Sequence, residues 1–186
     1  MAFPIGYSAL LANSPADGTA VAATVTATSL LTGSAAAGKT TLPANWLGSA
    51  AGFQLKVYAS GRISTPAATM GNPTFDIRFG SVIVATSPAF VSLASQTNIT
   101  WRLEWDLTVR AVGNGTSANV LHTGEFKSAL VSATNLMNLI PATAPVVGTG
   151  FDSTVSNTVD LFVTWSNATV GNTVQLHQYA LIGWAN

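Results

Sequence analysis

Apolar and polar residues alternate with a period of two along most of this chain. The longest run covers residues 97–112, where every second residue from Ile99 onward is apolar and the residues between them are mostly polar or charged. Such alternation predicts a β-strand with one face in a core and one face in solvent. We therefore expect four side chains of this run to point into the core: Trp101, Leu103, Trp105 and Leu107.

Similar patterns predict further strands, separated by turns rich in Gly, Pro and Asn. The clearest lie at residues 53–60, 75–79, 82–85, 159–165 and 173–184, and weaker ones at 20–31, 89–93 and 119–126. A short helical turn is expected between Ser128 and Leu139, with Pro141 and Pro145 ending it. The prediction is an all-β protein, an antiparallel β-sandwich with a jelly-roll or TNF-like topology.

Residues 1–18 differ from residues 19–186, which we interpret as a single β-sandwich domain. The large apolar residues of this first segment follow no clean period, and they include Phe3, Ile5, Tyr7 and Leu10. Asp17 and Gly18 then predict a turn into the first strand. Two interpretations remain open: the segment lies on its own domain, or it is an arm that docks on a partner subunit.

Charge and cysteine content exclude several classes of function. Only 8% of the 186 residues are charged, seven Lys and Arg balance seven Asp and Glu, and there is no Cys. This balance argues against nucleic acid and against a polybasic membrane patch, and the lack of Cys excludes thiolate metal sites. No basic segment opens the chain, so we expect no secretory leader, and no apolar run is long enough to span a membrane. A neutral, weakly charged surface favours self-association and an assembly-bound or extracellular structural protein.

Residues 33–40 match the Walker A pattern of nucleotide-binding proteins letter for letter. That site needs a helix to begin at the lysine, here Lys39, so that the helix amides bind phosphate. Pro43 follows closely and would break such a helix within its first turn. We interpret the segment as a flexible loop of small residues and expect no nucleotide cofactor.

Glu104 and Asp106 share one face of the longest strand, with their backbones roughly 7 Å apart. They resemble part of the Glu-x-Asp signature of some jelly-roll glycosidases, but the further Glu of that signature is missing. Arg102 and Arg110 lie on the same face, so an exposed salt-bridge ladder explains these residues. The only imidazoles, His122 and His177, lie on separate predicted strands, so we expect no metal site. We predict no catalytic residue and no enzymatic activity.

The last predicted strand looks apolar on both faces. Ala180 and Ile182 would lie on one face, and His177, Tyr179 and Leu181 on the other. A strand that is apolar on both sides is usually covered on both sides. A neighbouring subunit would supply this cover through Tyr179, Leu181 and His177, or the N-terminal segment would fold back over the strand.

The chain resembles small jelly-roll or TNF-like virion proteins of tailed bacteriophages. The resemblance covers most of residues 20–186, and five segments carry it: residues 42–47, 52–64, 101–110, 159–165 and 172–183. It implies a capsid decoration protein, a head fibre or a tail appendage, often trimeric. In TNF-like trimers, aromatic residues of the last strand meet at the three-fold axis, a role that would suit Tyr179.

We therefore expect a non-enzymatic virion structural protein, assembled in the host cytoplasm. The first expectation is a capsid decoration (cement) protein that binds the outer head surface as a homotrimer, with the major capsid protein as its partner. The alternative is a tail or fibre adhesion module that binds a host carbohydrate, with Trp46 and Tyr58 as candidate sugar platforms. A glycan-cleaving enzyme on the same fold is a third hypothesis. The sequence does not separate the first two.

Overall fold

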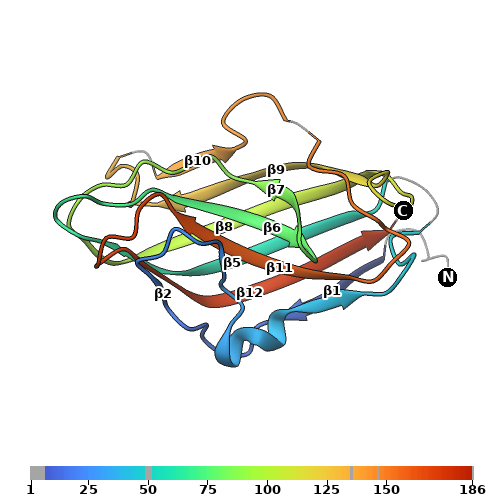
Figure 1. Ribbon diagram of the computed structural model, residues 1–186, viewed down its shortest axis with the longest axis horizontal. Coiled ribbons are helices and arrows are strands. Elements are labelled where there is room, and N and C mark those ends of the chain that lie inside the picture. The colour runs from blue at the N-terminus through green and yellow to red at the C-terminus, as the bar shows by residue number, and fades with distance from the viewer. Residues whose placement is uncertain (1–6, 49–51, 135, 146, 186) are drawn as a thin grey trace.

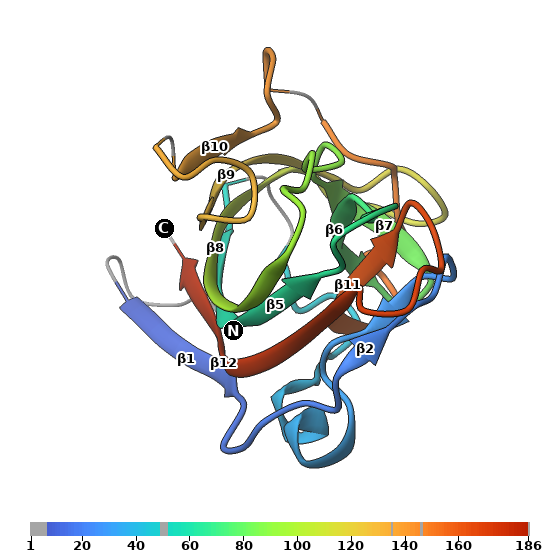
Figure 2. The same ribbon diagram turned by 90° about the vertical axis from the view of Figure 1, so that its left-hand side faces the viewer.

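Two antiparallel β-sheets form the protein. The computed structural model describes residues 7–48, 52–134, 136–145 and 147–185, and of Tyr7 and Ala185 the backbone alone. The larger sheet has seven strands: β1 (Tyr7–Asn13), β2 (Val21–Ala22), β5 (Gln54–Thr65), β8 (Gln96–Ala111), β9 (Asn119–Ser128), β10 (Met137–Ile140) and β12 (Thr173–Ala185). The smaller sheet has five: β3 (Thr28–Ser29), β4 (Thr40–Leu42), β6 (Pro73–Phe79), β7 (Val82–Thr86) and β11 (Asn157–Trp165). Figures 1 and 2 show the two layers around a common interior, which confirms the predicted all-β sandwich.

The order of the strands is that of a jelly roll. The larger sheet runs β1-β12-β5-β8-β9-β10, with β2 also paired to β12, and the smaller runs β3-β11-β6-β7, with β4 also paired to β11. The first and last strands are thus neighbours, and the chain crosses repeatedly between the sheets. Strand β9 forms a hairpin with β8, and β9 and the short strand β10 extend the larger sheet at one edge.

The predicted long strand is the centre of the core. Strand β8 pairs with β5 on one side and β9 on the other. Trp101, Leu103 and Trp105 are fully buried, and Leu107 is 1% exposed, as the alternation predicts. Aromatic side chains from both sheets and the loop after β7 pack together here, with the Phe90 and Phe126 rings stacked at 4.4 Å.

Three expectations about the weaker strands and the helical turn were wrong. Residues 89–93 are not a strand, because Phe90 is buried with one backbone bond to Pro73 and no continuous ladder. The predicted helical turn at 128–139 is instead a loop followed by β10, whose backbone groups pair with β9. Residues 20–31 form only the two-residue strands β2 and β3.

The Walker-like segment forms a short 3-10 helix, η1 (Gly33–Gly38), rather than a flexible loop. Lys39 leaves it in an extended conformation and enters β4, so no helix begins at this lysine. Its Nζ lies 2.8 Å from Oδ2 of Asp160, a buried residue of β11. Ser29 donates a hydrogen bond of 2.8 Å to the other oxygen of that carboxylate. Lys39 therefore has a structural partner in Asp160.

None of the helices in the described ranges is long and apolar enough to cross a membrane.

Candidate functional site

The two apolar residues expected at a trimer interface lie inside this chain. Tyr179 is 3% exposed and Leu181 is fully buried. A Cβ at Gly38 would lie 3.2 Å from the Tyr179 ring, so η1 packs directly against that ring. Burial raises the pKa of the Tyr179 hydroxyl strongly, and the nearby Asp160 carboxylate adds to this rise. The chain itself supplies the cover that we expected from a partner, so neither side chain is available to a second copy.

A β-bulge explains why β12 looks apolar on both faces. The register between β12 and β5 shifts between Leu176 and Gln178. An extra residue in one strand reverses the side to which all later residues point. Hence Tyr179 and Leu181 join Val174 and Leu176 on the buried face, while Gln178, Ala180 and Ile182 turn to the outer face.

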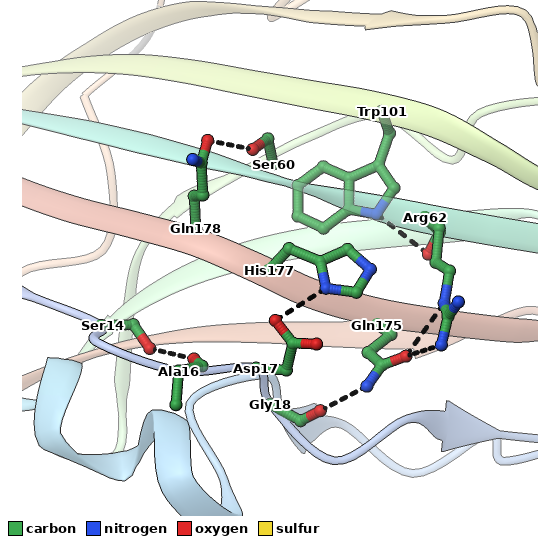
Figure 3. A network of polar contacts seen from close by, with 10 residues as sticks. All are labelled: Ser14, Ala16, Asp17, Gly18, Ser60, Arg62, Trp101, Gln175, His177 and Gln178. Atoms are coloured by element: carbon green, nitrogen blue, oxygen red, sulfur yellow. Dashed lines mark hydrogen bonds and ion pairs between the residues drawn. The ribbon is translucent and has the colours of Figure 1, made fainter.

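His177 sits at this bulge and is partly exposed. Its Nδ1 lies 2.8 Å from Oδ1 of Asp17, as Figure 3 shows. Beside it, Gln175 accepts two hydrogen bonds from Arg62 and donates one to the carbonyl of Gly18. These polar contacts attach the turn at residues 17–18 to the outer face of β12.

The candidate docking arm falls partly outside the described residues, since Phe3 and Ile5 both lie in residues 1–6. The backbone of Tyr7 opens β1, which pairs along its length with β12 of the same chain. Leu10 is 60% exposed on this strand, and Leu11 packs against the core. The described part of residues 1–18 is therefore an edge strand of the larger sheet and the turn that follows it.

A groove of about 490 Å³ lies on the outer face of the larger sheet, across β1, β12, β5 and β8. Ala180 and Ser60 provide small side chains in its floor, where larger residues would fill it. Longer side chains stand around them, namely Tyr58, Arg102, Glu104 and Gln178, and β1 and its following residue add Leu10, Asn13 and Ser14. Ala59, Leu103 and Tyr179 point into the core and contribute their backbone. Figure 3 shows Gln178 and Ser60 joined across the strands, with a hydrogen bond of 3.1 Å.

Tyr58 is the aromatic side chain of the groove, and it also contacts a cation. It lies opposite Ala180 on β12 and Glu104 on β8. The Lys56 Nζ lies 5.0 Å from the centre of its ring, and Lys56 does not line the groove. The pKa of Lys56 is raised, first by its hydrogen bond to the Tyr58 hydroxyl and then by Asp106, while burial opposes the rise. Tyr58 thus contacts Lys56 and also lines the groove, where Lys56 does not.

The carboxylates that resemble a glycosidase pair are bridged by one lysine. Lys56 Nζ lies 3.5 Å from Asp106 Oδ1 and 3.8 Å from Glu104 Oε2. A ladder of ion pairs on this face is confirmed, but Lys56 forms it rather than the two arginines that we expected. The guanidinium of Arg102 has no ion pair and no hydrogen bond within the described ranges.

The remaining candidates lie away from the groove. His122 is buried and its Nδ1 accepts a hydrogen bond of 3.2 Å from Trp105 Nε1. The part of the chain that the structure describes brings together no group of three or more His, Asp or Glu that could hold a metal ion. Trp46 packs edge-on against Phe53, with the ring centres 4.8 Å apart, and it does not line the groove. Of the two predicted sugar platforms, Tyr58 lines the groove.

Sequence reasoning missed most of the groove. Asn13, Ser14, Ser60 and Gln178 carry no motif, and they meet only because β1 and β12 pair beside β5. No local pattern marks Gln178, because its position on the outer face depends on how β12 pairs with β5.

No known protein family and no curated protein sequence matches this chain. Among solved structures, it is similar to the CBM2 module of the evolved Dit protein of Lactobacillus casei BL23 phage J-1. The two are 12% identical, with a TM-score of 0.39, and the similarity covers 77% of this chain and 67% of the other.

Proposed function

We propose that this protein is a non-enzymatic adhesion module that binds a carbohydrate in the groove of the larger sheet. The observation that carries the proposal is the position of Tyr58 beside a small-residue floor and a set of polar side chains. Binding sites for small ligands combine an apolar or aromatic surface with a few polar groups that fix orientation. The apolar face of a sugar ring packs on a phenol ring, while its hydroxyls need hydrogen-bond partners.

The lining suits a hydroxyl-rich ligand better than an apolar one. Asn13 and Gln178 each carry an amide that donates and accepts, Ser14 and Ser60 carry hydroxyls, and Glu104 accepts. Ser60 already donates to Gln178, and Ser14 donates to the Ala16 carbonyl. An apolar ligand would still bury the Asn13 amide and the Gln178 NH2 group without partners, at a cost of about 1–3 kcal/mol for each unpaired group. The groove also extends over four neighbouring strands, which leaves room for a chain of sugar rings rather than a single enclosed ring.

A virion is the proposed setting, and the resemblance of the sequence to bacteriophage virion proteins supports it. The weakly charged composition also suits an assembled particle. Self-association as a homotrimer belongs to the same proposal, since several linked grooves bind a repetitive surface more strongly than one groove does. Capsid decoration through the major capsid protein remains a prediction from sequence, and its interface would have to lie outside the buried Tyr179 and Leu181.

Titration of the purified protein against immobilised and soluble oligosaccharides tests the binding function. Tyr58→Ala removes the ring, and Ala180→Leu fills the floor of the groove without removing any polar group. Each substitution should weaken saccharide binding by about tenfold or more, the equivalent of about 1.4 kcal/mol. Thr108→Leu is the matched control for Ala180→Leu, because Thr108 of β8 lies on the same outer face of the larger sheet as Ala180 but outside the groove.

Two outcomes would overturn the proposal. One is the absence of saturable binding to any saccharide tested, and the other is binding that both groove substitutions leave unchanged. Electron microscopy of virions with labelled protein addresses the setting, because labelling of the tail supports adhesion and labelling over the head supports decoration.

A further inference from the structure

The outer face of the larger sheet carries several charged side chains, and Arg102 is the one cationic side chain among the residues that line the groove. Lys56 binds Asp106 and Glu104, and Lys127 forms an ion pair with Glu125. The exposed guanidinium of Arg102 has no ion pair within the described ranges, although the neighbouring strand β9 carries Glu125. Arg110 also has no ion pair there, but it lies outside the groove. The guanidinium of Arg102 is therefore available to bind an anionic group of a ligand.

The surroundings of Arg102 make a bound anion favourable. On one side it lies opposite Ser60 of β5, whose hydroxyl is held by Gln178, and on the other it lies opposite Lys127 of β9. The hydrogen bond to Glu125 raises the pKa of Lys127, and repulsion by the nearby Arg102 opposes part of this rise. An anion placed on Arg102 would offset this repulsion between the two cations.

Glu104 limits the kind of anion that fits. Its carboxylate lines the same groove and shares Lys56 with Asp106, so it is only partly neutralised. A doubly charged phosphate would meet this carboxylate at short range, whereas a singly charged group would not be repelled as strongly. A planar carboxylate also matches the fork of donors on a guanidinium, which binds it through two parallel hydrogen bonds.

We propose that the groove selects an acidic saccharide, one whose sugar ring bears a carboxylate as in a uronic acid. Arg102 binds the carboxylate, Tyr58 packs against the ring, and Gln178 with Ser60 binds the hydroxyls. This inference rests on the proposed carbohydrate-binding function and adds the chemical class of the ligand. Arg102 is then a specificity residue, and Tyr58 supports binding of acidic and neutral rings alike.

The test compares matched pairs of oligosaccharides: oligogalacturonate with oligogalactose, and oligoglucuronate with oligoglucose. Within each pair, a neutral CH2OH replaces the carboxylate. The acidic member of at least one pair should bind about tenfold to a hundredfold more tightly, and added salt should reduce this preference. Arg102→Gln should reduce the preference to about twofold or less. Arg110→Gln is the matched control, because it removes the same charge from the same face of β8 outside the groove.

The outcomes separate this inference from the function on which it rests. If Tyr58→Ala abolishes binding but acidic and neutral members bind equally, the groove binds carbohydrate and the acidic class is wrong. A preference that Arg110→Gln removes as fully as Arg102→Gln also overturns it, because general charge attraction would then explain the result. If the groove binds sulfated sugars more tightly than carboxylated ones, its preferred anionic group is a sulfate and not a carboxylate, and the proposal is overturned. If no saccharide of either class binds, both the function and this inference are overturned.

Discussion

The hydrogen bond between Trp105 and His122 allows a test of how the core is stabilised. Trp105 is fully buried on β8, its Nε1 donates to His122 Nδ1 at 3.2 Å, and the two rings meet edge to face at 5.8 Å. Trp165 offers a matched comparison on β11. It is 1% exposed, and its Nε1 is buried without a hydrogen-bond partner among the residues that the structure describes.

Replacing each tryptophan by phenylalanine removes a similar volume from a buried site, so the loss of packing should be similar. Trp105→Phe also leaves the buried acceptor of His122 unpaired, which costs about 1–3 kcal/mol. Trp165→Phe instead removes a donor that has no partner, so no acceptor is left unpaired. We expect Trp105→Phe to lower the free energy of unfolding by about 1–3 kcal/mol more than Trp165→Phe does. The larger substitution Trp105→Ala should cost about 3–5 kcal/mol.

Urea denaturation at pH 7.5, followed by circular dichroism, measures these differences, and coincidence with fluorescence checks that unfolding is two-state. Equal losses for the two phenylalanine variants would refute the contribution of the hydrogen bond. A loss below about 1 kcal/mol for Trp105→Ala would contradict the placement of this face of β8 in the core.

Three further predictions concern the titration of His122, the buried carboxylate and the state of assembly. Burial lowers the pKa of His122 from 6.5, so the unfolded chain takes up a proton at a higher pH than the folded chain does. The free energy of unfolding should therefore be full above about pH 6.5 and decline below it. His122→Asn should flatten this decline in a series of urea denaturation curves at different pH values. Lys39→Met leaves the Asp160 carboxylate with the Ser29 hydroxyl as its remaining partner among the described residues. This substitution should lower the free energy of unfolding by about 1–3 kcal/mol in thermal or urea unfolding, less than for a fully buried pair because Lys39 is partly exposed. Adding Asp160→Asn to Lys39→Met should recover part of this loss, and no recovery would show that the two do not act as a pair. Light scattering tests the predicted homotrimer, which a mass near 19.1 kDa at micromolar concentration would contradict.

The alternation of side chains by itself determined the fold class and the main strand. Residues 97–112 predict a strand because the period of two is local, and β8 occupies nearly this range with Trp101 and Trp105 buried. The shorter alternating runs likewise predict β5, β6, β7, β11 and β12 to within a few residues, except that β5 continues past Gly61. At Gly61 the backbone of β12 lies so close that any Cβ would collide with the Gln175 carbonyl oxygen. Glycine has no Cβ, so it allows this close pairing and does not end the strand.

Only the tertiary structure decided which side of β12 faces the core and where a ligand would bind. The alternation of residues 173–184 contains no sign of the bulge at His177, because a bulge depends on how β12 pairs with β5. That single extra residue moves Tyr179 from a predicted interface to the interior and moves Gln178 and Ala180 to the groove. The groove itself combines residues 10–14, 58–60, 102–104 and 178–180, which are distant in the chain and become neighbours through strand pairing. A local pattern determines whether a segment is a strand, whereas the register between distant strands determines which side chains meet.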